Sequence, residues 1–179
     1  NCVDKPKVMC EIGGRPIVSY IIDTLEKIGF SAEQIALVVG FHKEKIIEYF
    51  GSRVSYAEQS EQKGTAHATY VGSKFLPDSI EHILVINGDD SAFYRAETIK
   101  NILKIHEERE RKLTFVSLMK DDPTGLGRVI RGKNGLITNI VEEKDATESE
   151  RKIKEVNDGL YVFDKSWFEK NINKVKKGP

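Results

Sequence analysis

The sequence predicts an α/β fold in which helices alternate with the strands of a mixed, mainly parallel sheet. Short apolar runs at 35–39, 83–86 and 113–119 are typical of strands, and the first two are apolar throughout, as in strands buried on both faces. Segments with apolar residues at helical spacing lie between these runs. Strands that alternate with helices indicate βαβ units and hence parallel pairing.

In the first half of the chain, local signals support this alternation at each expected helix and strand. Pro16 suits the first position of a helix, where its missing N–H costs nothing, and Gly29 ends the apolar stripe that follows. Thr65 can cap a later helix through its hydroxyl. The expected elements are helix 16–28, strand 35–39, helix 43–50, strand 54–57, helix 65–75, strand 83–86, helix 97–110 and strand 113–119.

The second half carries hairpin signals instead. Strand-like pieces at 128–131 and 137–140 flank Asn134-Gly135, a dipeptide that favours a tight hairpin turn. Residues 156–163 have the pattern of a strand interrupted at Asn157-Asp158-Gly159. We therefore expect an antiparallel excursion or a small lobe in this half.

Composition excludes several function classes. The 179 residues suffice for one domain with a sizeable core, and no linker-like segment divides them, so we interpret 1–179 as a single domain. Basic and acidic residues balance at 28 each, which gives no support for a nucleic-acid partner. No apolar run approaches the roughly 18 residues that cross a bilayer, so no membrane partner is expected. The two cysteines make no disulfide framework, and we expect a cytoplasmic protein.

The strand at 83–86 leads into the most informative stretch, Asn87-Gly88-Asp89-Asp90. Ligands of open α/β sheets bind beyond the carboxyl ends of the strands. A carboxylate at that edge, behind a glycine that lets a ligand approach, suits a hard cation such as Mg²⁺ and therefore phosphate chemistry. The alternative is an ordinary turn or helix cap, because Gly-Asp after a strand is common.

Two further signals in the first half also have a ligand reading and an ordinary one. Lys7 follows a rigid proline and can meet phosphate as a point charge; the alternative is a solvated surface lysine. Gln59 and Gln62 carry amides that can read a base edge. They precede a helix start at Gly64-Thr65, where backbone N–H groups are free. The alternative for these residues is a polar loop that ends in a helix cap.

Two signals in the second half are similar. The glycines of Gly125-x-Gly127 remove side chains where a ligand can lie against the backbone. Glu142 and Asn157 place polar groups at strand ends, where they suit the hydroxyls of a sugar. The alternatives are a flexible hairpin and ordinary turn chemistry.

In this order and at these distances, the motifs resemble the nucleotidyltransferases that make nucleotide-sugars. The resemblance is strongest to the N-terminal domain of N-acetylglucosamine-1-phosphate uridylyltransferases. Its specific part is Asp-Asp-Pro-Thr-Gly-x-Gly-Arg at 121–128, followed by Val-Glu-x-Lys-Asp-Ala at 141–146. The matching strings lie at 5–8, 62–68, 88–89, 121–128, 141–147 and 156–159, nearly the whole chain. The fold that the resemblance implies is a three-layer α/β/α sandwich on a mixed, mainly parallel sheet.

The resemblance also implies roles at the nucleotide. Lys7 and Asp89 are the implied catalytic residues, with Lys7 at the nucleotide phosphates and Asp89 as a ligand of the cofactor Mg²⁺. Gln59 is the implied reader of the uracil, together with Gly64 and Thr65.

The implied sugar contacts are Gly127, Glu142 and Asn157. The implied reaction transfers UMP from UTP to N-acetylglucosamine 1-phosphate and gives UDP-N-acetylglucosamine and pyrophosphate. Two other readings stay open. One is a sister enzyme that uses glucose 1-phosphate with UTP or dTTP, and the other is a non-catalytic nucleotide-sugar-binding module on the same fold.

The chain departs from the family pattern at both ends. The family opens with a strand and a glycine-rich loop whose arginine wraps the triphosphate, and Asn1 begins just after that loop should end. A second magnesium ligand, an acetyltransferase domain and any contacts for oligomers would lie beyond residue 179. The sequence Asp90-Ser91-Ala92-Phe93 replaces the usual apolar residues and proline. We therefore expect an incomplete domain with little or no turnover.

Overall fold

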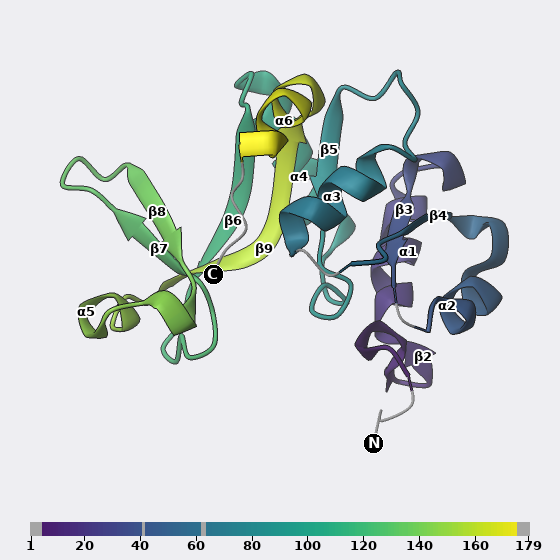
Figure 1. Cartoon of the computed structure of the whole chain (residues 1–179), viewed down its shortest axis with the longest axis horizontal. Helices are drawn as coiled ribbons and strands as arrows, with labels where there is room; N and C mark the ends of the chain where they lie inside the picture. The colour runs from purple at the N-terminus through teal and green to yellow at the C-terminus, as the bar shows by residue number, and fades with distance from the viewer. Residues whose placement is uncertain (1–4, 41, 62–63, 175–179) are drawn as a thin grey trace. The chain divides into compact units, whose positions relative to one another are not determined.

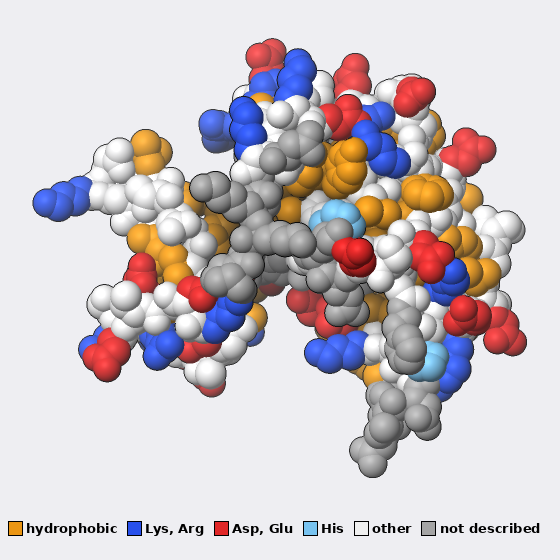
Figure 2. Space-filling model, viewed as in Figure 1, with side chains coloured by type: hydrophobic (Ala, Val, Ile, Leu, Met, Phe, Trp, Pro, Cys, Tyr) orange, Lys and Arg blue, Asp and Glu red, His pale blue; other side chains and the backbone are white. Residues whose placement is uncertain are grey.

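A computed structural model describes residues 5–40, 42–61 and 64–174. The chain forms two compact units (Figure 1). Unit 1 comprises Asn1–Leu113 and Val162–Pro179, and unit 2 comprises Thr114–Tyr161. On the face that Figure 2 shows, acidic and basic side chains are interspersed over both units, in keeping with the balanced charge.

Unit 1 contains the alternating helices and strands that the sequence predicts. Its helices are α1 (Ile17–Lys27), α2 (Lys43–Phe50), α3 (Thr65–Ser73), α4 (Ala96–Glu108) and α6 (Lys165–Asn171). Its strands are β1 (Glu11–Ile12), β2 (Arg15–Pro16), β3 (Ala36–Val39), β4 (Ser55–Glu58) and β5 (His82–Val85). Single 3-10 turns are η1 (Lys7–Met9), η2 (Ala32–Gln34), η3 (Gly51–Arg53) and η5 (Ile172–Lys174).

The strands of unit 1 fall into separate sheets. Strands β3 and β4 pair in parallel, from Ala36 opposite Ser55 to Val39 opposite Glu58. Strand β5 lies next to β9 (Glu155–Asp164), whose residues 162–164 belong to this unit. Within the described residues, β3 pairs only with β4, and β5 pairs only with β9. The predicted mixed α/β class is confirmed, and one long edge of β3 carries no neighbouring strand in the described part of the chain.

The core of unit 1 follows the helical periodicity of the sequence. Val18, Ile21 and Ile22 on α1 are buried at the spacing of one helix face. Helix α3 packs closely on β3, since a Cβ added at Gly72 would lie 2.8 Å from Val38 Cγ2. That contact leaves no room for a side chain at position 72.

A pair of histidines, one of them fully buried, joins β5 to α4. The rings of His82 and His106 meet edge to face, with centroids 4.9 Å apart, and His106 is fully buried. Burial of His106, and to a smaller extent the charge of His82, lowers the pKa of His106. Asp164 and Glu107 oppose this shift and Lys112 adds to it. The folded protein therefore disfavours a charged imidazole at this position.

This burial predicts a loss of stability in mild acid. Because the unfolded chain binds a proton at the ordinary histidine pKa near 6.5 and the folded protein resists it, the stabilisation is present above about pH 6.5 and is lost as pH falls toward the lowered pKa. Thermal unfolding of His106→Gln should therefore vary less between pH 7.5 and 5.5 than that of the unmodified chain. Parallel pH profiles for the two proteins would contradict the assignment.

Unit 2 is an antiparallel lobe, as the hairpin signals predict. It contains β7 (Arg128–Arg131), β8 (Ile137–Val141), η4 (Glu143–Asp145) and α5 (Glu148–Arg151), with most of β6 (Leu113–Met119) and β9. Strand β7 pairs antiparallel with β8 and with β9, and β6 pairs with β9. Gly135 adopts φ 75° in the β7–β8 turn, the backbone conformation for which an Asn-Gly turn is selected.

Three local expectations need correction. The interruption expected at 157–159 is wrong, because β9 continues through it and Gly159 adopts φ 82° within the strand. Pro16 is the residue before α1 rather than its first residue, since it pairs in β2 with an extended backbone. Cys10 is disulfide-bonded, so the cysteines no longer support a reducing compartment; Cys2 lies outside the described residues.

Candidate functional site

Unit 1 contains a cavity of about 540 Å³ that several of the predicted nucleotide residues line. Its walls are residues 35–39 and 82–88, together with residues of α1 and α3. Gln59, Gly64 and Thr65 all line it, as does Gly88. Residues from three separate segments of the sequence thus line one cavity of this unit.

Gln59 follows β4, and a histidine holds its side chain. Gln59 Nε2 lies 2.8 Å from His67 Nδ1, and the backbone N–H of Gln59 donates to Val39 O at 2.8 Å. The backbone and the side chain of Gln59 are therefore both held by hydrogen bonds. An amide whose orientation is set by a neighbour presents a defined pattern of donors and acceptors, which is what reading a base edge demands.

The start of α3 differs from its predicted form. Gly64, with φ 88°, is the N-cap residue, and Thr65 is the first residue of the helix rather than its cap. No side chain caps the helix, so the amides of its first turn are not closed off by a cap hydroxyl. A glycine is needed at position 64 because that backbone conformation is strained for other residues. Gln62 lies outside the described residues.

The segments that carry Lys7 and Asp89 touch through Val8 and Gly88. A Cβ added at Gly88 would lie 3.0 Å from Val8 Cγ1 and 3.4 Å from Val18 Cγ2. The glycine thus admits η1 against the end of β5, rather than a ligand as the sequence reading had it. Because Val8 follows Lys7 and Gly88 precedes Asp89, this contact places the lysine segment beside the carboxylate segment.

Asp89 fits a magnesium ligand in its surroundings. It lies in an exposed turn directly after β5, and the structure shows no hydrogen bond or ion pair to its carboxylate among the described residues. Those residues also contain no cluster of three or more His, Cys, Asp or Glu that could enclose a metal. Mg²⁺ commonly takes one or two carboxylates and completes its shell with water and substrate oxygens, so a single accessible Asp is compatible with it.

Unit 2 brings the three predicted sugar residues together. The backbone N–H of Asn157 donates to Gly127 O at 2.8 Å. Both carboxylate oxygens of Glu142 lie 3.5 Å from the position of a Cβ built on Gly127. A side chain at position 127 would therefore fill the space in front of the Glu142 carboxylate. The arrangement leaves a glycine backbone, a carboxylate and an amide within reach of one small polar ligand.

The side-chain amide of Asn157 is also held in place by two neighbouring groups. Its Nδ2 donates to the hydroxyl of Tyr161, and its Oδ1 accepts from the N–H of Gly159 at 3.3 Å. Burial raises the pKa of Tyr161. The phenol therefore stays neutral and keeps its hydroxyl as a hydrogen-bond partner at physiological pH.

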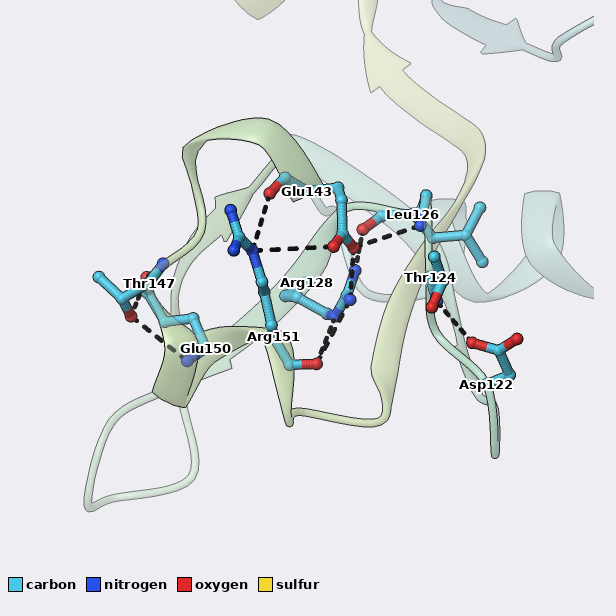
Figure 3. A network of polar contacts seen from close by, with 9 residues as sticks. Asp122, Thr124, Leu126, Arg128, Glu143, Thr147, Glu150 and Arg151 are labelled. Atoms are coloured by element: carbon cyan, nitrogen blue, oxygen red, sulfur yellow. Dashed lines mark hydrogen bonds and ion pairs between the residues drawn. The ribbon is translucent and has the colours of Figure 1, made fainter.

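The glycine loop of unit 2 is anchored by Arg128, which follows Gly127 (Figure 3). Arg128 donates to Glu143 Oε2 at 2.5 Å and to the carbonyl oxygen of Leu126. The bond from Arg128 is the main reason that the pKa of Glu143 is lowered, with the N–H of Gly125 contributing. Glu143 is therefore a charged partner of this arginine at neutral pH.

Sequence reasoning missed His67 and the Arg128–Glu143 pair. His67 belongs to a matching string, but nothing in the local pattern shows that α3 carries it to Gln59, eight residues earlier in the chain. Arg128 also belongs to a matching string, yet only the fold shows that its guanidinium is buried. The usable signal was that Arg128 and Glu143 directly follow the predicted contacts Gly127 and Glu142.

Comparison with known proteins agrees with this arrangement. The family model described as nucleotidyl transferase matches residues 3–179. A Bifunctional protein GlmU from Bacillus subtilis is 38% identical over 169 residues, which are 94% of this chain and 36% of the relative. The corresponding protein from Exiguobacterium sp. (strain ATCC BAA-1283 / AT1b) is 40% identical over 158 residues, 88% of this chain and 34% of the relative. The chain thus spans about a third of the length of these curated relatives.

Solved structures share the fold. HddC from Yersinia pseudotuberculosis superposes with a TM-score of 0.72 at 23% identity, over 93% of this chain and 71% of that one. A UDP-glucose pyrophosphorylase superposes with a TM-score of 0.74 at 19% identity, over 97% and 74%. The fold is an α/β fold of the kind that these structures share, with a polar cluster at Gly127, Glu142 and Asn157. The chain belongs to the nucleotidyl transferase family.

Proposed function

We propose that the chain is the nucleotidyltransferase domain of an N-acetylglucosamine-1-phosphate uridylyltransferase. UMP would pass from UTP to the sugar phosphate, with pyrophosphate leaving. The observation that carries the proposal is the contact of Val8 with Gly88, which puts the Lys7 segment beside Asp89 in the unit that also holds the Gln59–Gly64–Thr65 cavity. The GlmU relatives support the same reaction.

In this proposal unit 1 binds the nucleotide. Gln59, oriented by His67, meets the uracil edge, and the open amides at Gly64-Thr65 donate to it. Lys7 neutralises charge on the phosphates as a point charge. Asp89 would hold Mg²⁺, which when bound supplies charge neutralisation between the two phosphates. Chemistry of this kind depends mainly on positioning and electrostatics, and no residue needs to act as a covalent nucleophile.

Unit 2 would bind the sugar. Glu142 accepts hydrogen bonds from sugar hydroxyls, the amide of Asn157 can donate and accept, and the bare backbone of Gly127 lets the ring approach. A sister enzyme for glucose 1-phosphate would need the same hydroxyl contacts, so it stays the second candidate. A non-catalytic nucleotide-sugar-binding module is the third.

We also propose that the domain in its active form has one more strand than the described residues supply. The cavity of unit 1 is lined along β3 and along β5, and neither strand has a partner on that side among the described residues. Helices α1 and α3 line the same space. An added apolar strand there would satisfy two rows of backbone groups at once. The strand and glycine-rich loop with which the family opens would supply such a strand.

Among the described residues, no helix has the length and apolarity needed to span a bilayer. We propose a cytoplasmic enzyme that acts on the small molecules UTP and N-acetylglucosamine 1-phosphate.

Calorimetry tests the proposed function directly. UTP with Mg²⁺ and UDP-N-acetylglucosamine should bind the chain, and UDP-N-acetylglucosamine should bind more tightly than UDP-glucose. Equal binding of the two nucleotide-sugars would favour the sister enzyme. Binding without any turnover in the full-length parent protein would favour the non-catalytic module, and no binding of either ligand would refute all three.

A further inference from the structure

Arg128 is the largest side chain that is fully buried in the described part of the chain, with 1% of its surface exposed. A buried guanidinium is unfavourable unless its donors are paired. Its position in the sequence, directly after a predicted sugar contact at Gly127, makes the arrangement of its partners informative.

Every nitrogen of this guanidinium has a partner. Nη2 donates to Glu143 Oε2 at 2.5 Å, and Nη1 donates to Leu126 O. Nε and Nη2 also reach Arg151 O, at 3.4 and 3.3 Å. Figure 3 shows the guanidinium among these three partners. The arginine thus ties the glycine loop to η4 and to the end of α5.

Glu143 also binds the backbone of the same loop directly. Its Oε2 accepts the backbone N–H of Gly125 at 3.2 Å, in addition to the arginine. Farther back in the loop, the N–H of Thr124 donates to Asp122 Oδ1 at 3.1 Å. The loop that ends at Gly127 is therefore held along its length, and its strongest anchor is one carboxylate oxygen.

The two anchoring residues each adjoin a predicted sugar contact. Arg128 follows Gly127, and Glu143 follows Glu142. The ion pair therefore joins the two segments that carry Gly127 and Glu142, where the position of a Cβ added at Gly127 lies 3.5 Å from the Glu142 carboxylate oxygens. An ion pair that sets the distance between Gly127 and Glu142 affects the binding of a ligand without contacting the ligand.

We infer that the Arg128–Glu143 pair positions the sugar subsite by fixing the Gly127 loop against Glu142, and so sets affinity for the sugar part of the substrate. The inference rests on the proposed function of Gly127 and Glu142. Neither Arg128 nor Glu143 contacts substrate in it; both act through their neighbours. Loss of the acceptor oxygen at position 143 frees Gly125 and leaves a buried arginine without its anion.

The test compares two alanine variants in the same unit. Glu143→Ala removes the anchor, and Glu155→Ala is the matched control, because Glu155 forms a 2.7 Å ion pair with Arg131 that does not involve the glycine loop. Calorimetry measures the affinity of each protein for UDP-N-acetylglucosamine and for UTP, after circular dichroism has confirmed that each is folded.

Glu143→Ala should bind UDP-N-acetylglucosamine about tenfold more weakly and UTP as before, since a hydrogen bond to a charged group is worth about this much. Glu155→Ala should change neither affinity. Glu143→Gln, which keeps an acceptor oxygen at this position but not the charge, should recover part of the loss.

Two results would overturn the inference while the proposed function stands. One is an unchanged affinity of Glu143→Ala for UDP-N-acetylglucosamine. The other is an equal loss for UDP-N-acetylglucosamine and UTP, which would indicate a general structural role. Failure of the unmodified chain to bind either ligand would instead refute the proposed function, and the inference with it.

Discussion

Asp89→Asn should reduce turnover by about a thousandfold or more while the protein stays folded. The substitution keeps the size and shape of the side chain and removes the negative charge that a hard cation requires. Asp89 is exposed and follows β5 in a turn, and no hydrogen bond or ion pair of its carboxylate is seen among the described residues. Its loss therefore removes a ligand for Mg²⁺ without removing a structural contact.

The measurement is pyrophosphate release from UTP and N-acetylglucosamine 1-phosphate at increasing Mg²⁺ concentration. It uses an active form of the protein, extended at the N-terminus as described below. The matched control is Asp78→Asn, because Asp78 is an exposed aspartate in the turn before β5 and the substitution changes the charge equally. Unchanged Mg²⁺-dependent turnover in Asp89→Asn would exclude Asp89 as a ligand.

The neighbouring Asp90→Asn separates two readings of the acidic pair. If Asp90 is an extra ligand, its substitution should raise the Mg²⁺ concentration needed for half-maximal turnover. If it is a turn residue, the Mg²⁺ dependence should stay the same and only thermal stability should change.

Local patterns in the sequence predicted most of the elements of unit 1 and the hairpin of unit 2. Helix α2 and strands β6 and β7 have the expected bounds, because they depend on neighbouring residues: an apolar period and a closing glycine or turn. The wrong predictions also come from local sequence patterns. The Asn-Asp-Gly sequence in β9 is a turn signal, but pairing with other strands keeps Gly159 in the strand despite its positive φ.

The candidate site could be predicted only in part, because it depends on contacts between segments that are far apart in the sequence. The resemblance supplied the positions of Gly127 and Asn157, and the fold adds that their backbones are hydrogen-bonded. It could not supply the hydrogen bond between Gln59 and His67, nor the burial of Arg128, because both depend on packing of elements that no local period encodes. Gly88 shows the same limit: its small size admits Val8 rather than a ligand.

Extending the chain at its N-terminus with a strand and glycine-rich loop should convert a protein with little or no turnover into an active one. The residues that precede the matched region in one of the curated relatives supply the extension. The added loop would supply the pyrophosphate leaving group with backbone donors and a cation, and such donors are typically worth about 10²–10³ in rate each. The unextended chain should therefore be nearly inactive.

The strand of the extension should also stabilise the fold. The cavity of about 540 Å³ is lined largely by apolar residues. A strand in the part of it along β3 and β5, away from Gln59, Gly64 and Thr65, would bury side chains that each contribute roughly 1.5–3 kcal/mol when fully removed from water. After the entropy of ordering the strand is subtracted, we expect the thermal midpoint to rise by about 5–10 °C.

A matched extension of equal length, with serine at the apolar strand positions, separates filling of the cavity from mere lengthening. It should give neither the thermal shift nor the activity, because serine side chains cannot fill an apolar cavity and would bury unpaired hydroxyls. Equal turnover by the unextended and extended chains would refute the need for the loop. A thermal midpoint that the apolar extension leaves unchanged would show that the space between β3 and β5 does not receive a strand.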